Sequence, residues 1–282
     1  MKYRLLAIDI DGTLIGADQR VPRDVREAVS AAGEAGLRVC LATGRSLAES
    51  LPVWRQLPLR PPYEPLVTIG GAIVCEPDTG RTLYQRVIPR QVAVEFGDAL
   101  EGEGLSALAF VDGWRHGIDY YFAEHGDPQA AQEAWFSKMH VRVRRVNRLS
   151  DDPQMPCPAR ISAVAEPDAA RRTAEKLSPP FAGRLNVHSI VAPNYGVTVV
   201  EAFSHEADKF AAVAYVAQAH RIAAAGIAAV GDDVNDLPMI RRAGLGVTFT
   251  DAKPDLRDAA DHVADDGLAA FIHELIAGRF DG

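Results

Sequence analysis

The feature that most constrains this sequence is a set of short apolar runs that end abruptly on polar residues and alternate with helical patterns. Residues 3–9 read YRLLAID and end on Asp9, while residues 37–43 (LRVCLAT) and 227–232 (IAAVGD) follow the same plan. Apolar runs of this length are typical of buried strands. Because strands that alternate with helices form parallel sheets covered on both faces, we expect a doubly wound, Rossmann-like α/β core.

Helix signals lie between and after these runs. Pro22 precedes apolar residues at helical spacing, and the pattern stops at Gly36. Ser46 and Glu49 form a capping box that opens a helix to about residue 57. The other elements expected in the core are strands over 65–70 and 245–249, and helices over 207–221, from Asn235, from near Pro254 and over 268–277.

The pattern changes in the middle of the chain. Residues 85–203 hold most of the aromatic residues and several proline interruptions. Three stretches there are typical of an antiparallel sheet: 141–146, 160–165 and 197–203. We therefore expect a core formed by residues 1–84 and 204–282, interrupted by an inserted α+β cap domain over 85–203.

The composition argues against nucleic acids and membranes as partners of this protein. The formal net charge of −8 argues against a nucleic-acid binder, because affinity for the phosphate backbone comes from clustered Lys and Arg. No apolar run approaches a membrane span or a signal-peptide core, so we expect no membrane partner. The three cysteines form no C-x-x-C pair, which fits a reducing cytoplasm.

Polar residues that could take part in catalysis or binding follow the predicted strands, beginning with DIDGT at residues 9–13. Alternate residues of an extended strand share a side, so Asp9 and Asp11 can face one site. One carboxylate can serve as nucleophile and metal ligand, and the other as general acid and base. Taken alone, the motif is also consistent with an Asp-Gly turn that carries two solvated acids.

Two further groups offer contacts for a phosphate. In ATGR, residues 42–45, the Thr43 hydroxyl and the Gly44 amide precede a capped helix, a favourable place for an anion. The alternative is an ordinary strand-to-helix turn capped by Thr43. Lys209 lies near the start of the 207–221 helix, where its ammonium can meet a phosphoryl oxygen or can simply be solvated.

The last group is GDDVND, residues 231–236, directly after an apolar run. Asp232 would be a hard oxygen ligand, and with Asp9, a backbone carbonyl and waters it could hold Mg²⁺. Asn235 could reach a phosphate or cap the next helix, and Asp236 could simply complement the helix dipole.

With these four groups in this order, the sequence resembles the haloacid dehalogenase-like phosphatases, specifically the Cof-type branch (subfamily IIB) with a large inserted cap. The resemblance covers residues 1–84 and 204–282, while the inserted segment matches only in size and position. Two departures stand out. Gly70-Gly71-Ala72 replaces the usual Asn-Gly-Ala, and Phe210 follows Lys209 where Gly is usual.

The resemblance implies a role for each matched residue. Asp9 would attack phosphorus and become an aspartyl-phosphate, and Asp11 would protonate the leaving group and then activate water. Arg45 is a candidate substrate contact, with a surface arginine as the alternative. The phosphoryl oxygens would be held by the Ile10 amide, Thr43, Gly44, Lys209 and Asn235, and Mg²⁺ by Asp9, the Asp11 carbonyl and Asp232, with Asp236 in support.

The expected function is hydrolysis of a small phosphorylated metabolite, a sugar phosphate by preference, with cap residues 85–203 setting specificity. Three other functions remain open at this point. A phosphomutase of the same fold would return the phosphoryl group to a sugar, and a non-catalytic binding or regulatory protein could retain the fold. A phosphoprotein phosphatase is disfavoured, because a cap of over a hundred residues restricts large substrates. The sequence indicates neither the natural substrate nor the oligomeric state.

Overall fold

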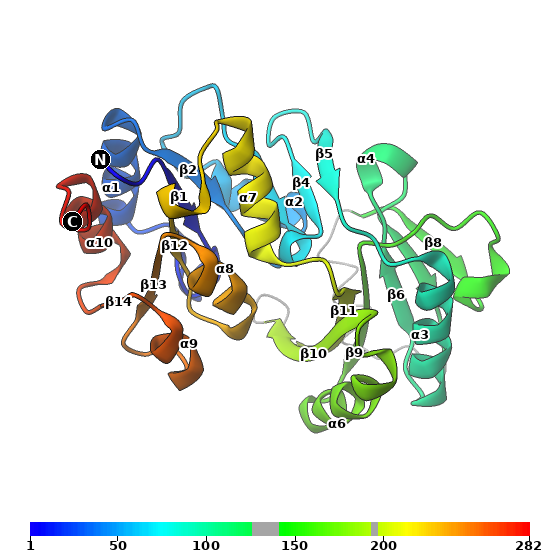
Figure 1. Ribbon diagram of the computed structural model, residues 1–282. Helices are drawn as coiled ribbons and strands as arrows, with labels where there is room; N and C mark the ends of the chain where they lie inside the picture. Colours follow the sequence, from blue (N-terminus) through cyan, green and yellow to red (C-terminus); the bar gives the residue numbers. More distant parts are fainter. Residues whose placement is uncertain (126–140, 193–196) are drawn as a thin grey trace. The chain divides into compact units, whose positions relative to one another are not determined.

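The computed structural model describes residues 1–125, 141–192 and 197–282, which form two compact units (Figure 1). The first unit comprises Met1–Tyr84 and Asp208–Gly282, and the second comprises Gln85–Ala207. The second boundary thus falls at residue 208 rather than at the expected residue 204. β11 (Val197–Ser204) pairs with β10 (Leu185–Ala192) as far as Ser204. The His205 amide then donates to the Arg184 carbonyl at 3.1 Å, which keeps the chain with the second unit beyond residue 204.

A five-stranded parallel sheet forms the centre of the first unit, in the order β14-β13-β12-β1-β2. Every residue of β1 and of β12 is buried, as the unbroken apolar runs predicted. The expected parallel α/β core is therefore confirmed. The strands are β1 (Leu5–Ile8), β2 (Arg38–Leu41), β12 (Ile227–Val230), β13 (Leu245–Phe249) and β14 (His262–Ala264).

Helices cover both faces of this sheet. Leu5 and Ala7 of β1 join side chains of α7 and α8 in one apolar core. Leu6 and Ile8, which point to the other face of the strand, are also fully buried. The helices are α1 (Arg23–Glu34), α2 (Leu47–Trp54), α7 (Lys209–Ala219), α8 (Leu237–Arg242), α9 (Pro254–Ala259) and α10 (Gly267–Ile276), and α1 packs against α10 and β2.

Local signals in the sequence set some of these boundaries correctly. The capping box that opens α2 is present: Ser46 accepts from the Glu49 amide, and Glu49 accepts from the Ser46 amide at 2.9 Å. The expected helix from Asn235 is wrong at its start. Val234–Asp236 form a 3₁₀ turn, η5, and the α-helix begins at Leu237.

The third expected strand belongs to a different sheet. β3 (Leu66–Thr68) pairs antiparallel with β4 (Ile73–Cys75), and β5 (Thr82–Gln85) completes a small three-stranded sheet. A single parallel bridge between Ala42 and Val67 connects it to the chain after β2. The 3₁₀ helix η1 (Ile69–Gly71) connects β3 to β4, and η4 (Ala224–Gly226) precedes β12.

The second unit has a six-stranded sheet in the order β10-β11-β9-β6-β7-β8. Antiparallel pairing is confirmed for the stretches at 160–165 and 197–203. The stretch at 141–146 differs, because only Val143–Val146 form a strand and this strand pairs parallel with β7. The remaining elements are β6 (Ala107–Phe110), β7 (Tyr120–Ala123), β8 (Val143–Val146), β9 (Arg160–Ala165), α3 (Arg90–Gly102), α4 (Gly113–His116), α6 (Pro167–Leu177), η2 (Leu149–Asp151) and η3 (Pro179–Phe181).

One face of this sheet packs against α3 and α6 through a large apolar cluster that includes Phe96, Ala109 and Val200. The second unit is therefore an α+β structure inserted between the two segments of the first. Within the described ranges, no helix has both the length and the apolar character needed to cross a membrane.

Candidate active site

The predicted polar residues lie at one edge of the first unit's sheet. β1 pairs in parallel register with β12 on one side and with β2 on the other. Asp9, Asp232 and Thr43 follow these strands, so the chain carries all three past the same carboxyl edge. This edge is where open α/β sheets bind their ligands.

A buried cluster of charges is centred on Lys209. Its ammonium donates to Asp9 Oδ1 at 2.5 Å and to Asp236 Oδ1 at 2.6 Å, and the three side chains are almost completely removed from solvent. Burial lowers the pKa of the Lys209 ammonium, but Asp236 and Asp9 outweigh burial and hold that pKa above its ordinary value. A solvated lysine, the alternative for this residue, is therefore wrong.

Gly71 lets the start of α7 approach this closely. Its φ is +94°, and a Cβ there would lie 2.2 Å from the Asp208 carbonyl oxygen and 2.8 Å from the Lys209 amide nitrogen. Asp208 caps α7 by accepting from the Ala211 amide at 2.7 Å. A side chain at position 71 would push the Lys209 end of the helix away, so this glycine fixes the position of the cation.

Asp232 also lies close to Asp9. Its Oδ1 accepts from the Thr13 hydroxyl at 3.0 Å, and its amide donates to Asp236 Oδ2 at 3.1 Å. Gly12 has a φ of +79°, and a Cβ there would lie 2.1 Å from Asp232 Oδ2. The turn after β1 thus requires glycine both for its backbone conformation and for the space that Asp232 occupies.

Asp9, Asp232 and Asp236 each offer a carboxylate oxygen, and these oxygens all lie within 4.8 Å of one another. Burial, assisted by the neighbouring carboxylate of Asp236, raises the pKa of Asp232 to about 6 and the pKa of Asp9 well above its usual range. Three acids that surround the single charge of the Lys209 ammonium carry excess negative charge. Hard oxygen donors with excess charge fit a cation such as Mg²⁺.

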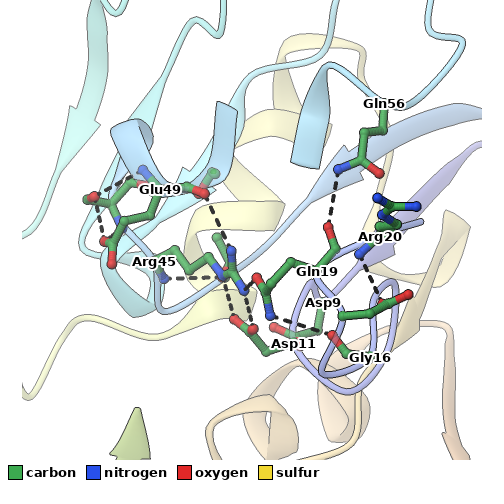
Figure 2. A network of polar contacts seen from close by, with 12 residues as sticks. Asp9, Asp11, Gly16, Gln19, Arg20, Arg45, Glu49 and Gln56 are labelled. Carbon is green, nitrogen blue, oxygen red and sulfur yellow. Dashed lines mark hydrogen bonds and ion pairs between the residues drawn. The ribbon is translucent and has the colours of Figure 1, made fainter. Parts of the chain in front are cut away.

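The Asp11 carboxylate lies outside this cluster and meets Arg45 instead (Figure 2). Arg45 Nε donates to Asp11 Oδ2 at 2.7 Å, and Arg45 Nη2 donates to Asp11 Oδ1. The surface alternative for Arg45 is wrong, because its side chain is only 8% exposed. The expected contribution of Asp11 to a metal site rests on its backbone carbonyl alone.

The predicted phosphate contacts are only partly brought together. Thr43 is buried, and its hydroxyl accepts from the Arg45 amide at 3.1 Å. Thr43 does not cap α2, since Ser46 does. A Cβ built on Gly44 would lie 3.9 Å from Asn235 Nδ2, so these two residues are neighbours. Asn235 is not a helix cap, because Asp233 caps η5. Ile10 is fully buried directly after Asp9.

The sequence indicates no role for Gln19 or Thr13, although both contact site residues. Gln19 Oε1 accepts from Arg45 Nη2 at 2.6 Å. The place of Thr13 in DIDGT could have identified it as a site residue. Gln19 stands in a polar loop, where no sequence pattern marks it.

Comparisons with known proteins agree with this geometry. A family model described as haloacid dehalogenase-like hydrolase matches residues 6–272. The 5-amino-6-(5-phospho-D-ribitylamino)uracil phosphatase YitU of Bacillus subtilis is 26% identical over 98% of this chain and 98% of its own length.

Solved structures match the fold. A haloacid dehalogenase-like hydrolase from Bacteroides thetaiotaomicron has a TM-score of 0.76 and 24% identity, and the match covers 97% of this chain and 99% of that chain. The subclass IIB sugar phosphatase BT4131 has a TM-score of 0.74 and 21% identity, with coverage of 97% and 99%. With a family model that spans almost the whole sequence, this chain belongs to the haloacid dehalogenase-like hydrolases.

Proposed function

We propose that this hydrolase is a Mg²⁺-dependent phosphatase that attacks small phosphate monoesters with the carboxylate of Asp9. The observation that carries the proposal is the convergence of Asp9, Lys209, Asp232 and Asp236 at the carboxyl edge of the sheet. A carboxylate beside a buried ammonium and a cation site is suited to a dianionic phosphate. The phosphatase names of the relatives support the same reaction class.

The residues of the site divide the steps of this reaction among them. An Asp9 oxygen forms a bond to phosphorus as the bond from phosphorus to the leaving oxygen breaks, and Asp11 gives that oxygen a proton. Water then attacks the phosphorus of the aspartyl-phosphate, and Asp11 takes a proton from the water. The bond from phosphorus to the Asp9 oxygen breaks, and inorganic phosphate leaves. Lys209, Thr43, Gly44, Asn235 and the Ile10 amide hold the phosphoryl oxygens during both steps.

The proposed Mg²⁺ would be held by Asp9, Asp232 and the Asp11 carbonyl, with Asp236 behind them. When bound, the ion would neutralise the phosphate dianion and orient the ester. Asp236 Oδ2 accepts from the amides of Asp232 and Asp233, at 3.1 and 3.2 Å, so its part is to orient Asp232 and to fix Lys209.

The substrate we propose is a small phosphorylated metabolite, with sugar phosphates first. YitU is named for a phosphoribityl compound and BT4131 is a sugar phosphatase, which supports a polyhydroxylated leaving group here. We assign selection among such substrates to the inserted second unit, residues 85–207. Release of free phosphate, rather than formation of an isomer, separates this function from a phosphomutase.

The test is release of inorganic phosphate from a panel of sugar phosphates by the wild-type protein, Asp9→Asn and Asp18→Asn. Asp18 is an exposed acid of the loop after Asp9 and serves as the matched control. We expect Asp9→Asn alone to lose turnover, because an amide cannot form the acyl-phosphate. Chelation should remove wild-type activity, and Mg²⁺ should restore it. Near-normal turnover by a folded Asp9→Asn protein would refute the covalent role.

A further inference from the structure

We infer that Arg45 is a positioning residue that holds the Asp11 carboxylate in one orientation, and that Gln19 in turn holds Arg45. This inference deepens the proposed function and rests on the general acid and base role assigned there to Asp11. It replaces the expectation that Arg45 contacts the substrate.

Arg45 and Asp11 form a bidentate ion pair. Nε and Nη2 of the guanidinium each donate to a different carboxylate oxygen, Nε to Oδ2 and Nη2 to Oδ1. Two parallel hydrogen bonds fix the plane of the carboxylate as well as its distance, which a single bond does not do. The Asp11 side chain is 38% exposed while that of Arg45 is 8% exposed. The anchor is therefore the buried partner, and the acid that it holds reaches toward solvent.

Hydrogen bonds hold both the backbone and the guanidinium of Arg45 (Figure 2). Its amide donates to the Thr43 hydroxyl at 3.1 Å, and its carbonyl accepts from the Ile69 amide at 2.9 Å. At the guanidinium, Nη2 donates to Gln19 Oε1 at 2.6 Å and Nη1 to the Glu49 carbonyl at 3.4 Å. The guanidinium that orients Asp11 is thus itself oriented by Gln19 and Glu49, which have no assigned step in the reaction.

Gln19 reaches Arg45 from an unusual backbone conformation. Its φ is 60°, in the left-handed region that residues other than glycine rarely adopt. Gln56, just beyond α2, holds this conformation, since its Nε2 donates to the Gln19 carbonyl at 3.2 Å and its Oε1 accepts from the Val21 amide at 3.0 Å. Backbone strain that surrounding contacts maintain is typical of functional sites. Here the strained residue points at the partner of the general acid.

A fixed orientation of the Asp11 carboxylate should affect the rate of the first step most when the leaving group needs a proton. The departing oxygen of a hexose phosphate is a poor leaving group, whereas p-nitrophenolate leaves with little help. If Arg45 acts through Asp11, loss of Arg45 should therefore copy loss of Asp11: a large effect on the hexose phosphate and a small one on p-nitrophenyl phosphate. A residue that binds substrate would instead act whether or not Asp11 is present.

The experiment is a double-mutant cycle with Asp11→Asn, Arg45→Ala and the pair, followed by single-turnover formation of the aspartyl-phosphate on both substrates. General acid assistance is worth about 10²–10⁴-fold, so we expect Arg45→Ala to cost about tenfold or more on the hexose phosphate and little on p-nitrophenyl phosphate. Arg45→Lys, which keeps the charge without the bidentate contact, should lie between. In the Asp11→Asn background, Arg45→Ala should cost nothing further.

Gln19→Ala keeps the inference testable if the Arg45 variants fold poorly. It should show a smaller loss with the same dependence on the leaving group. Arg20→Ala, an exposed arginine of the same loop, is the matched control and should behave like wild type.

Losses by Arg45→Ala and Asp11→Asn that multiply would overturn the inference, as would equal losses on both substrates. Loss of turnover in Asp9→Asn with multiplying losses would mean that the proposed function stands and the positioning role fails. Retained turnover in Asp9→Asn would refute the proposed function itself.

Discussion

Replacing Lys209 by methionine should destabilise the first unit strongly, because two buried acids would lose the cation that they share. Lys209 Nζ lies 2.5 Å from Asp9 and 2.6 Å from Asp236, and all three side chains are shielded from water. Removing one partner of a buried ionic group typically costs about 3–5 kcal/mol, since the remaining charge is uncompensated. Methionine keeps most of the volume, so this cost is chiefly electrostatic.

The assay is thermal unfolding followed by circular dichroism in the presence of a chelator, so that no bound cation can replace the ammonium. For a unit of this size, 3–5 kcal/mol corresponds to a fall in Tm of roughly 6–20 °C. Lys253→Met is the matched control, because the ion pair of Lys253 with Asp233 lies on the surface. That variant should lose less than about 1 kcal/mol. Equal effects of the two substitutions would refute the reasoning.

Two further predictions concern the stability of the first and of the second unit. Gly71→Ala should cost about 2–5 kcal/mol, from the positive φ and the contact with α7, and should lower activity by displacing Lys209. Gly33→Ala, in open space on α1, should instead stabilise slightly, and denaturant unfolding would compare the two. In the second unit, burial raises the pKa of Glu201, but His188 and Arg160 outweigh burial, so that this pKa lies below its ordinary value. Ionised Glu201 therefore stabilises the fold above the unfolded pKa of about 4.3, and this contribution is lost as the pH falls through the folded pKa. The stability difference between wild type and Glu201→Gln should shrink below about pH 4 in urea unfolding, and a difference independent of pH would contradict the assignment.

The sequence predicted the parts of the molecule that obey local rules. β1 and β12 are apolar runs long enough for one strand, and their parallel pairing follows from the intervening helices. Lys209 and Asp232 were singled out because they stand beside such elements. The side-chain contacts of these residues with Asp9 and Thr13 agree with a shared site.

What the sequence did not predict depends on which segments and side chains meet, whether they are near or far apart along the chain. β3 reads as another core strand, but its antiparallel pairing with β4 takes it into a second sheet. Gln19 has no periodic pattern around it, and its role depends on a left-handed backbone held by a residue 37 positions away. The direction of the Arg45 side chain is set in the same way, by Asp11 at a separation of 34 residues.

The place of β1 between β12 and β2 also fixes when the site can form during synthesis. β2 follows β1 closely, but β12 begins about 220 residues later, after the whole second unit. A ribosome needs roughly 10–45 s for such a stretch, and during that time one edge of β1 lacks its partner strand. Lys209 is made only near the end of this interval, and Asp232 is made directly after β12. A nascent chain that stalls within the second unit therefore carries Asp9 without the ammonium or the neighbouring acids that surround it in the finished protein, and it exposes a strand edge prone to aggregation.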